Sequence, residues 1–545
     1  MEHISSRIQT VVKELFDTDV SITLDRPDPQ FGDFATNVAL QLAKPLGKNP
    51  REIAEAIAAK LREIDNITDV TVAGPGFINV RLSSVGLLAL MRQDPRPTRA
   101  GQTIVIETNN PNPFKAMHIG HGFNAVLGDT IANLLAVSGA KVHRVSYHGD
   151  IGLHVGRSMY SLLAYADGDI TKIEAIPAAE RNSFMSKMYA EGSKAYKIDE
   201  AAKEQITALA EQSFAPGDEL YGRVYELCKA WSFEQIDTIV KRLGNIPIEQ
   251  RFLESAADAR GVETVQANVP GVFQESDGAL IFKGSEHGSF DNVFVGRNGR
   301  GLYAARDLGL MQLKNEAYHA DYSYIVTAEE QRDYFKGVIA AAGLVWPDQK
   351  DTTVNVSTGT VKLSTGKMSS REGDVVEIAW LFDEFANAIT ERGGDPSDEI
   401  VAGALRYQFL KVKIGSDVIF DINEAVSLTG NTGSYLQYAH ARAKSILRKA
   451  TTATTYPAEV RDEDRSLVRK LGEYHKVVAR ATSQLEPHHI CTYLFELAQE
   501  FNRYYEKNRV IGDEHEAHRV SLVASYADTL AAGLAILGVH APDTM

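Results

Sequence analysis

The segment from Glu107 to Asp129, ETNNPNPFKAMHIGHGFNAVLGD, places two histidines three residues apart among glycines, with asparagines and prolines just upstream. It begins at the end of a short apolar run, QTIVIE (102–107), of the kind that buried strands show. Beyond it, apolar residues recur at helical spacing as far as Gly139, at Val126, Leu127, Ile131, Leu134 and Leu135. A second strand-like run, KVHRVSY (141–147), follows. Strand, glycine-rich turn, helix and strand form a βαβ unit, which predicts the start of a parallel, Rossmann-like sheet.

The turn before this predicted helix carries the tetrad HIGH, residues 118–121. Free backbone N–H groups and the positive end of the helix dipole attract phosphate to a helix N-terminus. Gly120 and Gly122 would let the backbone approach an anion closely. His118 and His121 could donate hydrogen bonds to charge that develops on a transferring phosphoryl or nucleotidyl group. Taken alone, the tetrad fits a glycine turn with two exposed histidines equally well.

A metal site is another interpretation of two neighbouring histidines. No HExxH pattern or other cluster of ligands accompanies the pair, so we expect no metal-binding residues.

A second motif, TGKMSSREGD, occupies residues 365–374. Lys367 offers a point charge, and Ser369 and Ser370 offer hydroxyl donors, as a mobile clamp on a triphosphate requires. The glycine spacing, with Met368 after the lysine, excludes a P-loop. Alone, this loop is weak evidence of a phosphate-binding function. It becomes informative because it lies downstream of HIGH in the same predicted α/β domain.

Composition limits the class of protein. A chain of 545 residues is too long for one core, and a prior of about 150 residues per domain suggests three or four units. No apolar run approaches the roughly 20 residues that cross a bilayer. The first residues, MEHISSRIQTVVKELF, resemble an amphipathic helix more than a secretory or transit signal.

Cys228 and Cys491 are the only cysteines, which excludes a disulfide framework and indicates a reducing compartment, most simply the cytoplasm. The net charge of −15 argues against a protein that coats nucleic acid non-specifically. A nucleic-acid partner that docks on a local basic face is still compatible with this charge.

The pattern along the chain predicts three parts. Residues 1–95 read as an α+β module, with Ile53, Ile57 and Leu61 on one helical face and a strand pair around the turn GPG (74–76). A Pro-rich linker, DPRPTRAG (94–101), follows.

Residues 96–390 read as the Rossmann-like domain, with a charged helical insertion at about 158–245. The runs GALIFKG, NVFVGR, YSYIVTA and TTVNVSTGTVKLS are expected to complete its sheet late in the sequence. Residues 391–545 read as an all-α helical bundle, with one apolar stripe at Leu467, Leu471, Tyr474 and Val478 and another at Leu494, Leu497, Phe501 and Tyr505.

HIGH followed much later by KMSS resembles the paired signature of the class I aminoacyl-tRNA synthetases, and the surroundings resemble the arginyl-tRNA synthetases nearly end to end. The segments that carry this resemblance are FGDFATNVALQLAKPLGKNPREIAEAI, GPGFINVRLS, ETNNPNPFKAMHIGH, GDIGLHVG, GLYAARDLG, SYLQYAHARAKSI and YLFELAQEFNRYYEKNRV.

The resemblance implies an N-terminal module that binds the outer corner of the tRNA, a catalytic domain, and a helical anticodon-binding domain. The implied reaction joins L-arginine and ATP, with Mg²⁺, to arginyl-adenylate and pyrophosphate, and then transfers arginine to the terminal adenosine of tRNA(Arg). The resemblance also implies that arginine activation requires bound tRNA. A cytoplasmic monomer without a membrane partner is expected.

The resemblance also assigns roles to individual residues. The expected catalytic residues are His118, His121, Lys115 and Lys367. The expected ATP-binding residues are His118, Gly120, His121, Lys367, Met368, Ser369 and Ser370. The expected arginine-binding residues are Glu107, Asn112, His118, Asp150, Tyr303, Asp307 and Gln331. The expected tRNA-binding residues are Gln437, Tyr438, His440, Arg442 and Lys444.

Some of these residues have a purely structural alternative. A carboxylate such as Asp307 can accept two parallel hydrogen bonds from a guanidinium, which the ammonium of lysine cannot copy. The same carboxylate could instead pair with Arg306 or a nearby lysine. Tyr438 and His440 could stack on bases or belong to the core, and single basic residues of the helical part could simply face solvent.

The sequence departs from the family pattern at three places. Ser370 stands where class I synthetases usually have a second lysine, and Lys115 occupies the place of a compensating lysine before HIGH. Glu372 and Asp374 are acidic where relatives often carry lysine and asparagine. Tyr334 stands where a histidine is usual, and it is given no role.

Two other functions stay open at this point. A different nucleotidyl-transferring enzyme, such as a small-molecule ligase, would leave the N-terminal module and the helical C-terminal part without a purpose. A non-catalytic tRNA-binding paralogue is disfavoured because the chain retains His118, His121, Lys367, Glu107, Tyr303 and Asp307 together.

Overall fold

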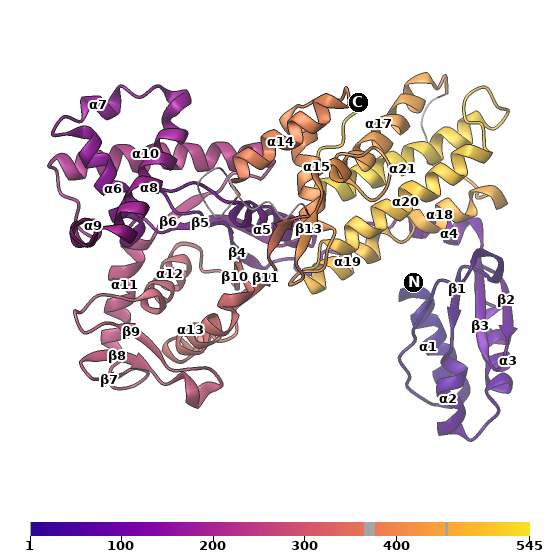
Figure 1. Cartoon of the computed structure of the whole chain (residues 1–545). Helices are drawn as coiled ribbons and strands as arrows, with labels where there is room; N and C mark the ends of the chain where they lie inside the picture. Colours follow the sequence, from indigo (N-terminus) through magenta and orange to yellow (C-terminus); the bar gives the residue numbers. More distant parts are fainter. Residues whose placement is uncertain (1, 365–375, 453–455) are drawn as a thin grey trace.

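The computed structural model describes residues 2–364, 376–452 and 456–545. Figure 1 shows three parts: an N-terminal module in indigo, an α/β part around a parallel sheet, and a group of long C-terminal helices in orange and yellow. The predicted fold class is confirmed, because a Rossmann-like sheet is combined with a small α+β module and an all-α bundle.

The N-terminal module packs helices against a three-stranded antiparallel sheet of order β1-β3-β2. The predicted strand pair around GPG is confirmed as a hairpin, in which Gly74 and Gly76 adopt φ of +54° and +145°. The predicted helical face of Ile53, Ile57 and Leu61 is buried. The elements are α1 (Glu2–Phe16), β1 (Phe34–Thr36), α2 (Val38–Leu46), α3 (Pro50–Leu61), β2 (Ile67–Ala73), β3 (Phe77–Leu82) and α4 (Ser84–Met91).

Five parallel strands form the central sheet in the order β11-β10-β4-β5-β6. They are β4 (Thr103–Asn109), β5 (Lys141–His148), β6 (Gln250–Leu253), β10 (Tyr322–Ala328) and β11 (Thr353–Thr358). Helix α5 (Ile119–Val137) connects β4 and β5, as the βαβ pattern predicts. The strand order changes direction between β4 and β10, so the carboxyl ends of these two strands border the crevice in which such sheets bind ligands.

One group of predicted strands belongs to a different sheet. The runs GALIFKG and NVFVGR do not extend the parallel sheet, and that prediction is wrong. They contain β8 (Ala279–Phe282) and β9 (Asn292–Val295), which form an antiparallel sheet with β7 (Gln274–Ser276). This sheet packs its phenylalanines on α12 (Tyr303–Tyr318) and α13 (Arg332–Val345).

The last predicted run divides between two sheets. Its first half is β11, whereas β12 (Val361–Leu363) pairs with β13 (Val418–Phe420) in a separate parallel pair. Strand β6 was not predicted.

Helices fill most of the remaining chain. Residues 153–242, all of which are described, hold five α-helices and one short 3-10 helix. The α-helices are α6 (Leu153–Ala166), α7 (Thr171–Glu174), α8 (Arg181–Ile198), α9 (Glu200–Gln212) and α10 (Leu220–Arg242). Helix α11 (Glu254–Ala267) follows β6. The C-terminal helices are α14 (Ile378–Glu391), α15 (Asp398–Leu410), α16 (Ile422–Ala425), α17 (Gly433–Lys449), α18 (Arg465–Leu471), α19 (Tyr474–Gln484), α20 (His488–Lys507) and α21 (Glu516–Ile536). The first predicted stripe is divided between α18 and α19, and the second lies on α20.

Arg406 on α15 joins the C-terminal helices to the central sheet. Its fully buried guanidinium donates five hydrogen bonds, whose acceptors are Asp129, Thr130, Leu243, Asn245 and Leu537. The pair with Asp129 on α5 is an ion pair of 2.8 Å. One buried charge therefore connects the helix after HIGH, the end of α10 and the residue after α21.

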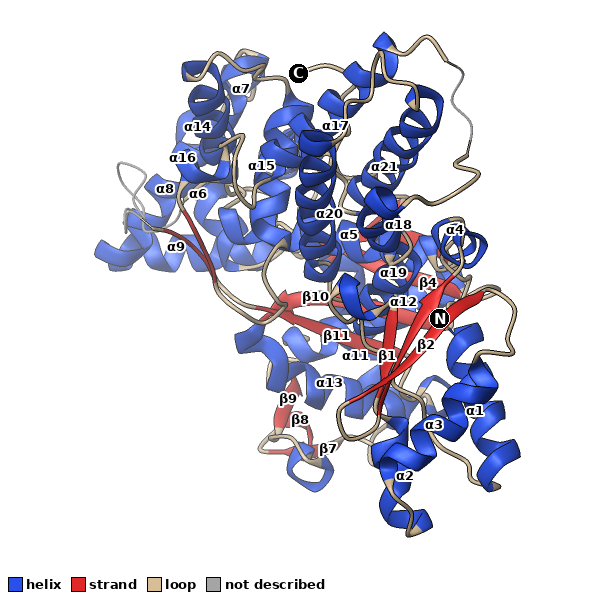
Figure 2. Cartoon of the chain, turned by 90° about the vertical axis from the view of Figure 1, so that its right-hand side faces the viewer, coloured by secondary structure: helices blue, strands red, loops and turns tan. Residues whose placement is uncertain are grey.

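The N-terminal module docks on the C-terminal helices, and both views show it beside α18 (Figures 1 and 2). The buried carboxylate of Asp33 forms ion pairs with Arg465 and Arg469 of α18. Arg92, just beyond α4, donates a hydrogen bond of 3.0 Å to the carbonyl oxygen of Pro457. Charged side chains therefore fasten the two outer parts of the molecule to each other.

Candidate active site

The HIGH tetrad lies where the chain passes from β4 into α5, at the carboxyl edge of the sheet. His118 Nδ1 accepts a hydrogen bond from the backbone N–H of His121, and His121 Nδ1 accepts one from the backbone N–H of His118, each at 3.3 Å. The two rings stack with their centroids 3.5 Å apart. Because each Nδ1 is an acceptor, each neutral imidazole carries its proton on Nε2. Both rings therefore present an Nε2–H donor at a helix N-terminus.

The surroundings keep both imidazoles neutral. Burial lowers the pKa of His118 to about 4, and the positive charge of Lys115 contributes. Burial also lowers the pKa of His121 well below its usual value, with further contributions from His118 and Lys115. At neutral pH the histidines are thus uncharged donors, and the positive character of the site comes from Lys115 and the helix N-terminus.

The second motif can be located only by its flanks. The predicted residues Lys367, Met368, Ser369 and Ser370, together with Glu372 and Asp374, lie outside the described residues. Directly after them, the chain is bonded to the HIGH turn: the N–H of Ile119 donates to the carbonyl of Val376 at 2.8 Å, and the N–H of Ile378 to that of Met117 at 3.0 Å. The described segment that follows the second motif is therefore held against the first motif.

The two glycines after His118 are in tight places. A Cβ atom at Gly122 would lie 2.6 Å from the side chain of Ile378, and one at Gly120 would lie 3.1 Å from the ring of His118. Gly122 thus allows the close packing of α14 on α5. Gly120 lies beside the ring of His118, where the anion approach is expected.

Asp307 on α12 has no basic partner within ion-pair distance among the described residues. Its Oδ2 instead accepts a hydrogen bond of 2.5 Å from the hydroxyl of Tyr334 on α13. Arg306, the alternative partner, is bound elsewhere, by Glu254 at 2.7 Å and Asp258 at 2.9 Å. The alternative pairing of Asp307 with its neighbour is therefore not formed.

The charge environment of Asp307 is unusual. Burial raises its pKa to about 7, the carboxylates of Glu107 and Glu254 add to the rise, and the hydrogen bond from Tyr334 opposes it. An acid in this state favours a cationic partner, because a nearby positive charge stabilises its ionised form.

Glu107 is held at the end of β4 by two contacts. Its Oε1 forms a buried ion pair of 2.6 Å with Lys314, and its Oε2 accepts a hydrogen bond of 2.6 Å from Asn110. Both carboxylate oxygens are thus engaged inside the protein.

Asp150 is also bound internally. Its carboxylate accepts hydrogen bonds from the backbone N–H and the hydroxyl of Ser255, and from the hydroxyl of Tyr225. Asn112 accepts a hydrogen bond of 3.0 Å from the N–H of Gly149, which brings the segment before HIGH against the loop after β5. These contacts shape the crevice at the ends of β4 and β5.

The two remaining residues expected to bind arginine lie at its surface. Tyr303, at the start of α12, is 72% exposed, and Gln331, in the short turn after β10, is also exposed. The expected set therefore spans a deep part, with Glu107 and Asp150, and an open rim. Asp307 is bonded to Tyr334, a residue for which the family resemblance predicted no role.

The expected tRNA contacts on α17 divide into two groups. Gln437 and His440 point into the protein, where Gln437 donates to the carbonyl oxygens of Glu399 and His540, and His440 Nδ1 lies 2.8 Å from that of Pro542. Both are buried and offer no surface in this conformation. The alternative of a core position applies to His440.

Tyr438, by contrast, is exposed. Arg442 lies over the ring of Tyr505, and Lys444 pairs with Asp543 at 3.5 Å. These three side chains remain at the periphery of the helical bundle.

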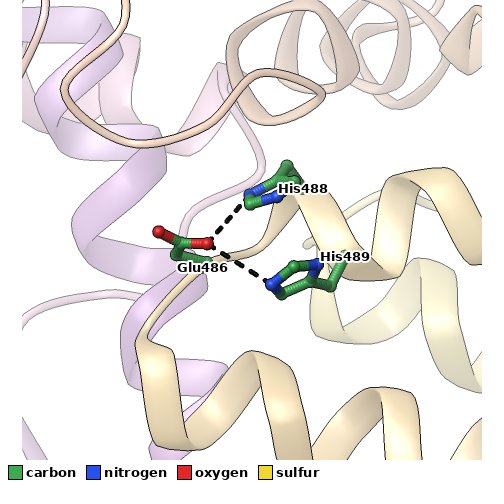
Figure 3. A group of neighbouring side chains, drawn as sticks. All are labelled: Glu486, His488 and His489. Carbon is green, nitrogen blue, oxygen red and sulfur yellow. Dashed lines mark ion pairs between the residues drawn. The ribbon is translucent and has the colours of Figure 1, made fainter.

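One group of potential metal ligands occurs among the described residues, Glu486, His488 and His489 before and at the start of α20 (Figure 3). Both histidines lie beside Glu486 Oε2, at 3.6 and 3.3 Å. Lys413 lies 3.8 Å from the same carboxylate. Burial lowers the pKa of both histidines, and the positive charges of Lys413 and Arg480 contribute. Two cationic neighbours and a helix N-terminus oppose a bound cation here.

The described part of the chain contains no helix with the length and apolar character that membrane crossing needs.

Comparison with known proteins gives matches over the whole chain. The family model described as "tRNA synthetases class I (R), catalytic domain" matches residues 86–420. The model "Arginyl tRNA synthetase N terminal domain" matches residues 2–82, and "DALR anticodon binding domain" matches residues 436–545. A curated protein of Frankia casuarinae named arginine–tRNA ligase is 31% identical, covering 99% of this chain and 97% of that protein. A protein of the same name from Thermobifida fusca is 31% identical, covering 99% of both.

Solved structures agree in fold. The arginyl-tRNA synthetase of Thermus thermophilus superposes with a TM-score of 0.82 at 24% identity, covering 100% of both chains. The arginyl-tRNA synthetase of Plasmodium falciparum gives 0.79 at 20% identity, covering 100% of this chain and 99% of the other. At these identities the likeness shows a shared fold.

Proposed function

The chain belongs to the arginyl-tRNA synthetase family, and from this premise we propose that it is an arginine–tRNA ligase with its arginine site at Asp307. In the first step, the carboxylate of arginine attacks the α-phosphate of ATP and displaces pyrophosphate, which gives arginyl-adenylate. In the second step, a ribose hydroxyl of the terminal adenosine of tRNA(Arg) attacks the activated carbonyl and releases AMP. No covalent enzyme intermediate is needed, because the enzyme acts by positioning and by charge stabilisation.

One observation carries the assignment of arginine to this site: the carboxylate of Asp307 lacks a basic partner within ion-pair distance among the described residues. A guanidinium supplies a fixed charge and two parallel N–H donors to such a carboxylate. A neutral side chain would leave the acid without its counter-ion, and this provides discrimination without a separate editing site. Tyr303 and Gln331 lie at the exposed rim, where they can close on a bound side chain.

The phosphates of ATP are assigned to the HIGH turn. The Nε2–H donors of His118 and His121, the charge of Lys115 and the N-terminus of α5 form a set that fits anionic oxygens. Lys367, Met368, Ser369 and Ser370 are assigned to the same phosphates on the family resemblance. These donors suit the triphosphate and not its cation, so Mg²⁺ would accompany ATP, and the side chains of the HIGH turn would contact the phosphates.

The division into domains follows the same reasoning. Residues 1–95 form a tRNA-binding module, 96–390 the catalytic domain with a helical insertion at about 158–245, and 391–545 the anticodon-binding domain. On α17, the tRNA contacts are Tyr438, Arg442 and Lys444, since Gln437 and His440 are buried. The protein acts as a cytoplasmic monomer.

Arginine-dependent exchange of pyrophosphate into ATP tests the assignment, with and without total tRNA and with lysine and citrulline as competing substrates. We expect exchange only with arginine and only with tRNA. Asp307→Ala should lose roughly 3–5 kcal/mol in kcat/KM for arginine, the scale for breaking a buried charge pair. Asp333→Asn, an exposed carboxylate on α13, is the matched control and should behave as the wild type.

Unchanged kcat/KM for arginine in Asp307→Ala would refute the pocket. If tRNA bound but no amino acid supported exchange, we would conclude that the protein is a non-catalytic tRNA-binding paralogue.

A further inference from the structure

Two tyrosines on different elements interact with Asp307, one through a hydrogen bond and the other electrostatically. Tyr334 on α13 donates to Asp307 Oδ2 at 2.5 Å. Tyr147, near the end of β5, interacts electrostatically with Asp307, with Glu254 and Glu107 as further acidic neighbours and Arg306 as a basic one. The sequence patterns assigned neither tyrosine a role.

Among the residues that the structure describes, the hydroxyl of Tyr147 has no hydrogen-bond partner, although its oxygen is buried. Leaving a buried hydroxyl unpaired is costly, and such groups in native proteins usually have a partner that is absent from the structure. Every basic side chain nearby is already bound: Arg306 to Glu254 and Asp258, and Lys314 to Glu107. A substrate donor that enters the site would supply the hydroxyl of Tyr147 with the partner that the described side chains do not give it.

The bond from Tyr334 has a different effect. It fixes one oxygen of Asp307 and stabilises the carboxylate in its ionised form. An ionised carboxylate has about four acceptor positions, so Asp307 can still accept from a guanidinium after one position is taken. Tyr334 therefore orients the acid without using up its capacity to bind substrate.

We propose that Tyr147 and Tyr334 determine the specificity of the arginine site, Tyr147 as a hydrogen-bond partner of the substrate guanidinium and Tyr334 as the residue that positions Asp307. This inference rests on the proposed function. A guanidinium carries five N–H donors in a plane, so it can bond to Asp307 and to a hydroxyl beside it at the same time. An ammonium is a compact charge without this fixed geometry.

The charges around Asp307 predict how removal of the Tyr334 hydroxyl would change the pH dependence of arginine binding. The groups that face it are Glu107 on β4, Tyr147 on β5, Glu254 on α11, Lys314 on its own helix and Tyr334 on α13. Removing the Tyr334 hydroxyl removes a bond that favours the ionised acid, so the pKa of Asp307 rises further. A protonated Asp307 cannot pair with a guanidinium, and the defect must therefore be greatest at low pH.

The experiment is arginine-dependent pyrophosphate exchange with tRNA, measured from pH 6 to 9 for wild type, Tyr334→Phe and Tyr147→Phe. For Tyr334→Phe we expect the acid limb of kcat/KM for arginine to move to higher pH, with a loss of about tenfold near pH 6.5 that shrinks near pH 8.5. For Tyr147→Phe we expect a loss of about 10- to 100-fold at every pH, the scale for one hydrogen bond to a charged group. In both variants the KM for ATP should be unchanged.

Tyr318→Phe is the matched control, because Tyr318 lies on the same helix as Asp307 and packs on the ring of His143 instead. It should match the wild type at all pH values. Thermal unfolding of each variant separates a folding defect from a binding defect. If Tyr334→Phe does not fold, Tyr147→Phe still tests the pocket, and a wild-type kcat/KM in that variant overturns its role.

The possible failures can be told apart. If the wild type shows no exchange with arginine, the proposed function fails. If the wild type is active and both tyrosine variants behave as Tyr318→Phe, only the present inference fails. A pH-independent loss in Tyr334→Phe would contradict its action through the ionisation of Asp307.

Discussion

Replacing Arg406 by methionine should destabilise the whole molecule, because this guanidinium is fully buried and joins three separate segments. Removing one partner of a buried ion pair costs about 3–5 kcal/mol, since the remaining charge is left without compensation. Here Asp129 keeps two weaker contacts, with Arg144 at 3.4 Å and the N–H of Ile246 at 3.1 Å. The carbonyl oxygen of Leu537 loses its donor and adds to the cost. We expect a net loss of about 3–5 kcal/mol.

Urea unfolding measures this loss, with tyrosine and tryptophan fluorescence and exchange activity followed in parallel. A chain of several domains can unfold in steps, so the first transition is compared between variants. Arg503→Met is the control, because Arg503 is 63% exposed and its pair with Glu500 lies at the surface. A surface pair contributes about 0–1 kcal/mol. A loss in Arg406→Met no larger than in this control would refute the reasoning.

The double variant Arg406→Met, Asp129→Asn sharpens the test. It removes the uncompensated carboxylate together with the guanidinium, so it should be more stable than the sum of the two single changes predicts. Strict additivity would show that the pair is not the source of the effect.

Three further predictions concern other ionisable side chains. Lys314→Met should lower the free energy of unfolding by about 3–5 kcal/mol, because the buried carboxylate of Glu107 loses its cation. Adding Glu107→Gln should recover part of this loss. Equal free energies of unfolding in the single and the double variant would contradict the prediction. The pKa of His118 is about 4 in the folded protein and near 6.5 when unfolded, so the unfolded chain binds more protons between these values. The stability that this residue contributes is therefore complete above pH 6.5 and is lost as the pH falls towards 4. The thermal unfolding temperature of His118→Asn should depend less on pH across this range than that of the wild type. An equal pH dependence in the two proteins would count against a buried neutral imidazole. Lys444→Ala should weaken tRNA binding and reduce the slope of log affinity against log salt by about 1, whereas a slope equal to that of the wild type would remove Lys444 from the contact.

The sequence predicted those parts of the fold whose pattern is local. The spacing of Val126, Ile131 and Leu134 defines α5, and the alternation around Gly74 and Gly76 defines a hairpin whose partner is its neighbour in the chain. For β8 and β9, alternation indicated strands but not their partners, because the pattern of one strand carries no information on which sheet it joins. Strand β6 has only four residues, QRFL, and no alternation long enough to recognise.

The same distinction applies to the site. Motifs and the family resemblance predict His118, His121 and Asp307 as site residues, and the structure brings the flank of the second motif to the first. Tyr334 was set aside because it departs from the family residue, although its hydroxyl reaches Asp307 across helices that the sequence cannot orient. Tyr147 lies in a strand pattern, where an aromatic residue is ordinary, so only the missing partner of its hydroxyl distinguishes it.

The attachment of the N-terminal module does not depend on the peptide link at residues 93–102 alone. Asp33 forms ion pairs with Arg465 and Arg469, and Arg92 donates a hydrogen bond to the carbonyl oxygen of Pro457. Side chains from distant parts of the sequence therefore hold the module in place. Cleavage after Arg92 would leave two fragments that stay associated without a covalent bond. This chain therefore offers a natural place to divide the enzyme into two separately expressed pieces, whose reassembly can be followed by return of activity on mixing.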